Sequence, residues 1–440
     1  MNINALSFNA LPPIDLPFRF FLTAPVFIIV CALLILCSGE TLWLSRWQPS
    51  MLALTHGFTL GFITMVMMGA LLQLLPVIGG IGIAKPRRIV LVCHSALVVG
   101  TLCLMANFIW PSTLLTVITL LLLVLGLGIY IAAIALVLLK KLSQGDSIIG
   151  FRLAIVSLFF VIILGALMLN LSLPTAIDLS IFSSSFTGKN LTNSHAVLGL
   201  VGWGSLMIMS VSFQVIPMFH VAPSFSKKIS GYLPTGLFVL LLLFVFKPKI
   251  MTPIIMLVHG VFALSLLFII SKRKRKIPDN TIRYWQLAAL SLITLNVFYF
   301  FPESYLPAIY IPETVAQNKT MLLAAFFIYF YLVAVIQGML LKILPFLSYT
   351  HLQQRCLTNF SAMQYLPHMH EFLDKKHGKW LFYLHVITGV ILLSTIMFPS
   401  IYWLLSMLLI IEFSWLLTLM IKTIRLYFST LNKINSSVNE

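Results

Sequence analysis

The stretch HGFTLGFITMVMMGALLQLLP, residues 56–76, contains no charged residue and is long enough to cross a bilayer as one helix. Its last eight residues, GALLQLLP (69–76), recur in form as SVSFQVIP (210–217) and GMLLKILP (338–345). Each copy begins with a small residue, has a Gln or Lys four positions later, and ends in a Pro that is expected to close the helix. Because the copies lie 141 and 128 residues apart, the chain is predicted to contain an internal repeat.

The composition around this stretch points to the same class of protein. Of the 440 residues, 60% are hydrophobic and only 9% are charged, with a mean hydropathy of +1.04. Soluble domains carry about 25% charged residues, so the chain is predicted to be an integral membrane protein. A soluble enzyme, a nucleic-acid-binding protein and a secreted disulfide-stabilised domain are excluded. The formal net charge of +17 therefore needs an explanation other than nucleic acid.

Twelve apolar runs are long enough to cross about 30 Å of hydrocarbon at about 1.5 Å per residue. The repeated eight-residue pattern closes the second, sixth and tenth of them, which gives a period of four helices. The predicted fold is all-α: a polytopic membrane protein with twelve transmembrane helices in a single transmembrane domain. Three four-helix units, residues 19–140, 151–271 and 283–428, are expected around a pseudo-threefold axis. The predicted spans are residues 19–39, 51–78, 88–108, 112–139, 151–172, 193–219, 232–247, 250–271, 283–302, 318–346, 378–398 and 400–428.

The positive charge is distributed unevenly between the two sides of these spans. The segments on the side of the two termini hold 22 Lys and Arg residues, whereas the opposite loops hold five, namely Arg46, Lys189, Lys247, Lys249 and Lys319. The positive-inside rule therefore predicts that both termini lie in the cytoplasm. The run KRKRK at 272–276 is interpreted as an orientation signal that also contacts anionic membrane lipid.

Three histidines are predicted to form an outer layer within the spans. His56 and His195 lie near the starts of the second and sixth spans, and His259 lies nine residues into the eighth. Neutral imidazole tolerates burial and is a common ligand of haem iron and copper. His56 and His195 are the candidate metal ligands of this layer. The alternative is that each histidine is a polar anchor at the interface or a hydrogen-bonding group between helices.

A second polar layer is predicted nearer the cytoplasm. His94 and His385 lie in the third and eleventh spans, which are equivalent under the four-helix period, and Gln73, Gln214 and Lys342 lie at a similar depth. This layer is compatible with a second cofactor, a water-filled cavity or a proton path. The alternative is that the Gln and Lys side chains cap carbonyls that the following Pro leaves free.

Glu412 is the carboxylate nearest to the middle of a span. Acidic groups are costly inside a bilayer and are therefore functional candidates. One hypothesis is a proton relay or a counter-charge, with Lys342, Gln73 and Gln214 on the same proton path. The other is a protonated acid that is hydrogen-bonded to a neighbouring helix.

The motifs in three spans resemble those of a known family. The first span begins PFRFFLTA (17–24), the second carries His56 followed by Gly61 and Phe62, and the sixth carries His195 in an HA-x-x-G pattern. Together with twelve spans and a period of four, these features resemble the haem-copper oxidase subunit I superfamily, and most closely its NnrS-like members. These are haem- and copper-associated proteins of bacterial nitrosative-stress defence.

The resemblance implies a protein of the bacterial inner membrane that binds haem b, with copper as a second option. Nitric oxide is the implied small ligand, and the implied role is nitrosative-stress tolerance or electron transfer. The chain departs from an oxygen reductase, because Tyr329 and Tyr331 lie where the tenth helix would carry haem ligands and the seventh helix has no histidine. Oxygen reduction is therefore excluded. The alternative function is a permease for a small solute or a metal ion.

Overall fold

The computed structural model describes residues 12–79, 82–140, 146–173, 188–300, 313–357 and 360–436. Within them the regular secondary structure is entirely helical, with no β-strand. Ten of the described helices are long and apolar enough to cross a membrane, so this is an all-helical, multi-pass membrane protein. Helices also occupy the two other predicted ranges: a shorter apolar helix, Lys228–Phe244, and α11 (Asn280–Phe300).

The helices follow one another in three comparable series. The first contains α1 (Asp15–Ser38), α2 (Pro49–His56), η3 (Gly57–Thr64), α3 (Met65–Gly79), α4 (Pro86–Ile109) and α5 (Thr113–Leu139). The second contains α6 (Asp146–Asn170), α7 (Gly188–Val197), η5 (Leu198–Ser205), α8 (Leu206–His220), η6 (Lys228–Tyr232), α9 (Leu233–Phe244) and α10 (Pro248–Ser271). The third contains α11 (Asn280–Phe300), α12 (Glu313–Ala325), η8 (Phe326–Val333), α13 (Ala334–Cys356), α14 (Lys375–Met397) and α15 (Tyr402–Ser436).

The second helix of each series contains a π-helical segment of eight residues. These segments are η3, η5 and η8, and each joins two α-helices into one continuous rod. They begin 141 and 128 residues apart, which is the spacing of the sequence repeat. Because π-helical turns are rare and concentrate at functional positions, their recurrence at this spacing is a structural counterpart of the repeat.

The prolines of the repeat do not end their helices. α3 continues past Pro76 to Gly79, α8 continues past Pro217 to His220, and α13 continues past Pro345 to Cys356. The expectation that these prolines close the helices was therefore wrong. Membrane helices tolerate internal Pro because neighbouring groups and local adjustments satisfy the freed carbonyls.

The first and second helices of each series pack at the small residue that opens the repeat. A Cβ atom on Gly69 would lie 2.8 Å from Cβ of Phe20 in α1, and one on Gly338 would lie 2.5 Å from Cβ of Tyr284 in α11. In the second series, Ser210 meets Gly150 of α6 at the matching position. Small residues at such contacts let membrane helices approach closely. The packing therefore explains why the repeat begins with Gly or Ser.

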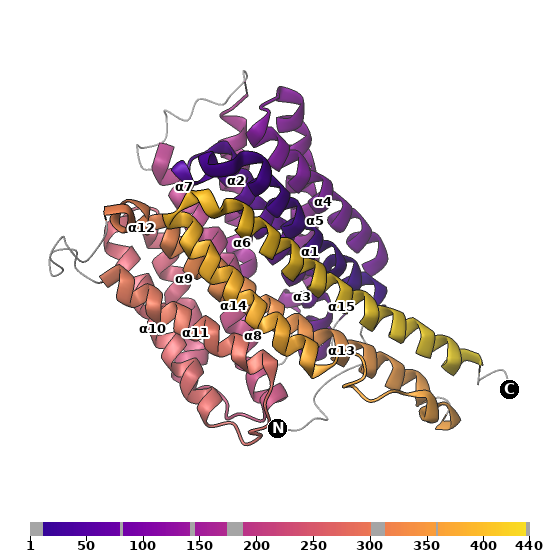
Figure 1. The fold of residues 1–440 in the computed structure, drawn as a ribbon. Helices are drawn as coiled ribbons and strands as arrows, with labels where there is room; N and C mark the ends of the chain where they lie inside the picture. Colours follow the sequence, from indigo (N-terminus) through magenta and orange to yellow (C-terminus); the bar gives the residue numbers. More distant parts are fainter. Residues whose placement is uncertain are drawn as a thin grey trace.

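The last helix of each series packs against the first helix of the next. α5 lies against α6, α10 against α11, and α15 returns to α1, so the bundle closes on itself. Figure 1 shows α1 and α15 side by side along their length. Their opposite ends are joined by the Ser406 hydroxyl, which donates to the carbonyl oxygen of Ala32, and by the edge-to-face rings of Phe18 and Tyr427.

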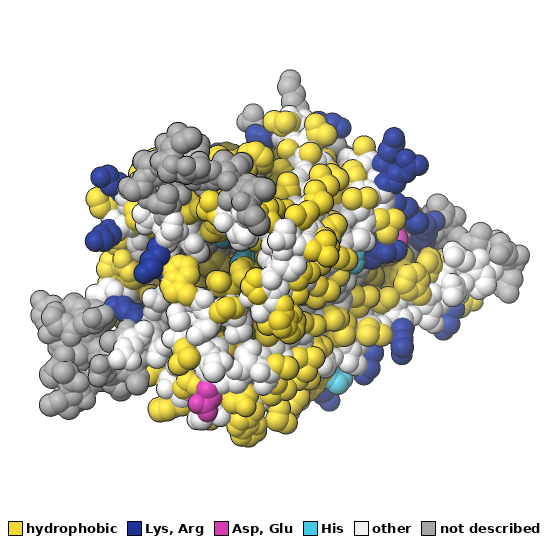
Figure 2. Space-filling view, turned by 90° about the horizontal axis from the view of Figure 1, so that it is seen from above, with side chains coloured by type: hydrophobic (Ala, Val, Ile, Leu, Met, Phe, Trp, Pro, Cys, Tyr) yellow, Lys and Arg dark blue, Asp and Glu magenta, His cyan; other side chains and the backbone are white. Residues whose placement is uncertain are grey.

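The outside of the bundle is hydrophobic. Figure 2 shows hydrophobic side chains across the middle of the visible face, with Lys and Arg side chains gathered toward its margins. Large apolar residues such as Leu114, Leu136, Leu264 and Phe268 are exposed on the helices. In water, an exposed apolar surface of this extent would promote aggregation. In a membrane, lipid hydrocarbon chains cover such a surface, which agrees with the assignment to a membrane protein.

Candidate functional site

His56 and His195 lie next to each other, although they belong to different series. Their ring centroids are 6.2 Å apart and their ring planes differ by 28°. His56 is the last residue of α2, directly before η3, and His195 lies in α7, three residues before η5. The structure therefore brings together the two histidines that the sequence suggested as metal ligands.

Backbone carbonyls fix which nitrogen of each ring is free. His56 Nδ1 lies 2.8 Å from the carbonyl oxygen of Leu52, and His195 Nδ1 lies 3.1 Å from that of Val161. A carbonyl oxygen only accepts, so each Nδ1 carries the hydrogen and each Nε2 keeps its lone pair. Neither Nε2 has a hydrogen-bond partner within the described part of the chain. Metal-binding histidines are commonly held in this way.

An aromatic ring lies against His56, and two sulfur-containing side chains lie next to the adjoining Gly57. The ring of Phe108 lies 5.1 Å from that of His56, and a Cβ atom on Gly57 would meet the sulfur of Cys31 and the side chain of Met105. Among the described residues, no group of three or more His, Cys, Asp and Glu side chains is placed to hold a metal ion. A metal at this position would therefore depend on the two imidazoles and on softer or exogenous ligands.

The three π-helical segments meet through matching polar contacts. The indole Nε1 of Trp203 in η5 donates to Thr64 Oγ1 of η3 over 3.0 Å, and the Tyr331 hydroxyl of η8 lies 2.9 Å from Ser205 Oγ of η5. In both contacts an aromatic residue at the sixth position of one segment reaches the hydroxyl residue at the eighth position of the preceding segment. The contacts therefore repeat with the same register as the sequence.

His259 belongs to this inner contact and not to the His56 and His195 pair. Its Nδ1 lies 2.8 Å from the carbonyl oxygen of Ile255, and its Nε2 lies 3.0 Å from Ser205 Oγ. The Ser205 hydroxyl therefore donates to His259 and accepts from Tyr331. Ser205 lies roughly 15 Å beyond His195 along the same span, at about 1.5 Å per residue. The structure thus separates His259 from the other two histidines of the predicted outer layer.

A fully buried cluster surrounds Glu412. The Tyr329 hydroxyl donates to Glu412 Oε2 over 2.6 Å, and His385 Nδ1 lies 2.7 Å from Glu412 Oε1. The side chains of Glu412 and His385 are both 0% exposed. The rings of Tyr329 and His385 are stacked with centroids 4.4 Å apart, and the ring of Tyr284 lies 5.6 Å from that of the histidine. The cluster joins η8, α14, α15 and α11.

The Glu412 cluster has several positions for one proton. His385 Nε2 is buried without a partner in the described residues. If Glu412 is ionised and His385 is neutral with its hydrogen on Nδ1, Nε2 is a bare lone pair and the cluster is negative. If the carboxyl is protonated or the imidazole is charged, the cluster is neutral and an N–H group is orphaned. Each arrangement leaves either a net charge or an unsatisfied N–H group in a low-dielectric interior, and both are costly there.

The residues of the predicted inner layer do not form one site. His94 Nε2 lies 3.0 Å from Thr23 Oγ1, and its ring packs edge-on against Phe20. The side-chain amide of Gln73 is buried, and neither its nitrogen nor its oxygen has a partner in the described residues. Gln214 is partly exposed. The structure therefore shows neither a joint site nor Gln73 capping a carbonyl.

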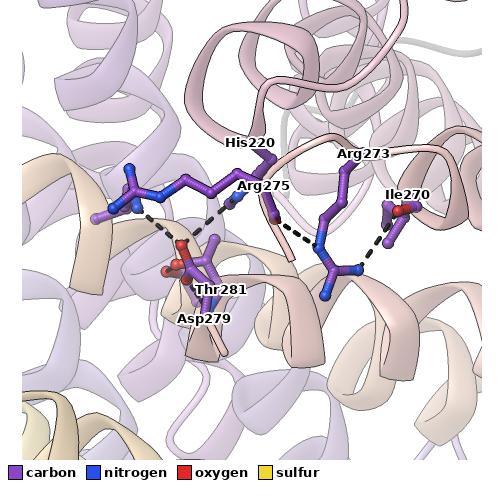
Figure 3. A network of polar contacts seen from close by, with 8 residues as sticks. His220, Ile270, Arg273, Arg275, Asp279 and Thr281 are labelled. Atoms are coloured by element: carbon purple, nitrogen blue, oxygen red, sulfur yellow. Dashed lines mark hydrogen bonds and ion pairs between the residues drawn. The ribbon is translucent and has the colours of Figure 1, made fainter. Parts of the chain in front are cut away.

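Lys342 takes part in an ion-pair cluster at one end of the bundle. Its Nζ lies 2.8 Å from Asp279 Oδ2, and His220 Nδ1 lies 3.6 Å from the same oxygen. Figure 3 shows His220 and Asp279 pointing toward each other beneath Arg275. Burial alone would raise the pKa of Asp279, but the hydrogen bond and charge of Lys342 outweigh it, so this pKa is lowered. Asp279 therefore stays ionised at neutral pH.

Several of these residues were missed in the sequence, although a signal for some of them was present. Phe62, Trp203 and Tyr331 stand at equivalent positions of the repeat, each two residues before Thr64, Ser205 or Val333. If the three copies of the repeat are aligned over the residues that precede the eight-residue Pro motif, the aromatic position and the position two residues after it stand out. Asp279 and His220 carry no comparable signal, because a loop and a helix end come together only in three dimensions.

The fold and these clusters define a multi-pass, all-helical membrane protein with a histidine pair near one end and a buried acid–imidazole–phenol cluster in its interior. A scan against protein-family models finds no match to this chain, and a search of curated proteins finds none either.

Proposed function

We propose that the chain crosses the membrane twelve times as three four-helix units around a pseudo-threefold axis. Three observations support this arrangement: the spacing of η3, η5 and η8, the repeated contact of first and second helices at a small residue, and the closed ring of neighbouring series. The two helices outside the set of ten, Lys228–Phe244 and α11, would complete the count. With the charge distribution of the loops, both termini would face the cytoplasm of a bacterial inner membrane.

The function that the geometry supports best is metal binding between His56 and His195, with haem b iron as the first candidate and copper as the second. The observation that carries it is the pair of imidazoles whose Nδ1 atoms are both bonded to carbonyls, so that both Nε2 atoms are free to bind a metal. A metal ion about 2 Å from each Nε2, with the two rings on opposite sides of it, would put the ring centroids roughly 6 Å apart, and the distance here is 6.2 Å.

A haem iron in this position would supply one-electron chemistry, and a coordination position for nitric oxide whenever only one imidazole is bound. The chain's own part is to hold the two imidazoles in one tautomer and to surround them with apolar side chains such as Phe108. This proposal agrees with the resemblance to NnrS-like proteins, and it places the function in nitrosative-stress tolerance or electron transfer.

The test is an ultraviolet-visible spectrum of the purified protein, oxidised and reduced, with haem counted by pyridine haemochrome and copper counted by elemental analysis. We expect close to one metal centre per chain. His56→Ala and His195→Ala should each lose more than half of the bound metal, whereas His377→Ala, in the first turn of α14, should lose none. Equal retention in all three variants, or a colourless protein without copper, would overturn the assignment.

A second candidate function is proton-coupled transport of a small solute, and the Glu412 cluster is the observation that favours it. A buried carboxyl group bonded to both an imidazole and a phenol is the kind of group that relays protons within membranes. Proteoliposomes with an internal pH dye would report proton flux under an imposed gradient. Flux in the wild type that is lost in Glu412→Gln would support this function, and absence of flux in the wild type would eliminate it.

A further inference from the structure

A cavity lies at the end of the bundle where α8, the connection between α10 and α11, α13 and the start of α14 meet. Its volume is about 140 Å³. His220, Arg275, Asp279 and Lys342 line it, and Figure 3 shows the first three from close by. This end is the one predicted to face the cytoplasm, far from the His56 and His195 pair. The cavity is therefore a separate candidate site.

The lining of this cavity is strongly cationic. Arg273, Arg275, Lys342 and Lys375 contribute positive charges, whereas Asp279 is the only carboxylate among the lining residues. Asp279 is already used, because its Oδ2 pairs with Lys342 Nζ and its Oδ1 accepts from the backbone N–H of Thr281. One carboxylate does not balance four cations, so the cavity carries an excess of positive charge.

Two of the lining side chains have unused hydrogen-bonding capacity. The His220 side chain is only 3% exposed, and its Nε2 has no partner in the described residues. The guanidinium of Arg275 likewise has no hydrogen-bond or ion-pair partner there, since only its backbone carbonyl is engaged, by Arg273 Nε. A buried polar atom without a partner is unfavourable unless a ligand satisfies it. The geometry thus presents a buried imidazole and a solvent-exposed guanidinium to the same cavity.

We propose that this cavity binds a phosphate group. Arg pairs with phosphate through two parallel hydrogen bonds and Lys supplies a further charge-assisted bond, so these donors match a tetrahedral oxyanion. The neutral His220 ring adds an ordinary hydrogen bond when its hydrogen lies on Nε2. The volume of about 140 Å³ is large enough to admit such a group. The phosphate comes either from the headgroup of a phospholipid, since exposed Phe268 and Ile277 lie on the adjoining surface, or from a free phosphate compound in the cytoplasm.

The test compares two single-charge changes in the same basic run. Arg275→Gln removes a cation that lines the cavity, whereas Lys276→Gln removes an exposed cation next to it that does not line the cavity. Each purified full-length protein is titrated with inorganic phosphate at constant ionic strength, and binding is followed by the shift in melting temperature. In parallel, native mass spectrometry counts the phospholipids retained by each variant. Neither change removes a hydrogen bond between side chains, so both variants are expected to fold.

We expect wild type and Lys276→Gln to bind alike and Arg275→Gln to bind at least tenfold more weakly. If inorganic phosphate gives this pattern, the source is a free phosphate compound. If only phospholipid retention gives it, the source is a lipid headgroup. Equal binding by all three proteins, equal loss in both variants, or no binding of either phosphate source to the wild type would overturn the proposal. His220→Phe keeps an aromatic ring at this position but removes Nε2. It should weaken the same binding and therefore provides an independent check.

Discussion

His94 and His385 occupy matching places in the first and third series of helices, but their partners differ in kind. Each lies on the third helix of its series and packs against an aromatic residue of the first helix, Phe20 or Tyr284. His94 is partly exposed and bonds to the Thr23 hydroxyl, whereas His385 is fully buried and bonds to the Glu412 carboxyl group. The same scaffold position therefore carries a hydrogen bond to a hydroxyl group in one series and a hydrogen bond to a carboxyl group in the other.

In the second series the corresponding contact contains no imidazole. Gly150 of α6 lies between Ser210 of α8 and Pro234 of α9. Three copies of one packing arrangement thus hold a neutral hydrogen bond, an apolar contact and an acid–imidazole pair. The comparison shows that the three series share the way in which their helices approach one another, while the polar groups at this position differ between them.

The largest effect is expected when the carboxyl group of the third series is removed. Glu412→Ala leaves His385 Nδ1 buried without a partner and removes the acceptor of the Tyr329 hydroxyl, so the free energy of unfolding should fall by about 3–5 kcal/mol. Unfolding in detergent, followed by circular dichroism, measures the change. Glu412→Gln keeps the shape and an acceptor oxygen, so it should lose clearly less. An alanine variant as stable as the wild type would show that the cluster contributes nothing to folding.

An intermediate effect is expected at the small residues that the two series share. Gly338→Ala would drive a Cβ atom into Tyr284, and Gly69→Ala would drive one into Phe20 and Phe21. Overpacking of this kind costs about 1–3 kcal/mol, and we expect similar losses in melting temperature for both variants. Gly128→Ala in α5, where a Cβ atom would meet nothing within 4 Å, is the matched control. If only one of the two variants lost stability, the helix contacts would not be equivalent.

The smallest effect is expected at the partner of His94. Thr23→Ala removes the acceptor for His94 Nε2 but leaves the ring partly exposed, where other groups can replace the bond. Hydrogen bonds between membrane helices average about 0.6 kcal/mol, and the unfolding free energy should fall by no more than about this amount. The same detergent unfolding assay applies. A loss as large as that of Glu412→Ala would mean that the two histidines are energetically alike.

The positions of most helices could be predicted from the sequence, whereas fewer of the contacts in the candidate sites could be. Apolar runs and the repeat predicted helices in the right ranges, because hydrophobicity and length alone decide what can cross a bilayer. The proximity of His56 and His195 also followed from their similar depth. Depth along a helix does not determine which way a side chain faces, however, and for this reason His259 was grouped with the wrong partners.

The partners of Glu412 and Lys342 could not be read from the sequence. Tyr329 was noted only as a replacement for a missing ligand, although its hydroxyl is a donor that a buried carboxyl group requires. Asp279 lies in a charged connection that looks like any solvated loop, yet it accepts from Lys342. The first pair depends on how two distant helices are rotated about their axes, and the second depends on where a connection lies against a helix. Composition and spacing specify neither.

The π-helical segments have a consequence for the rotational phase of the helices that carry them. A turn closed by i→i+5 bonds accommodates one extra residue, and each extra residue rotates everything beyond it by about 100°. A single helical wheel drawn through residues 49–79 is therefore out of phase on one side of η3. Each of the three helices that contain η3, η5 and η8 is therefore rotated about its axis on one side of the π-helical segment relative to the other side. As a result, the outer half of the helix faces one set of neighbouring helices and the inner half faces another set.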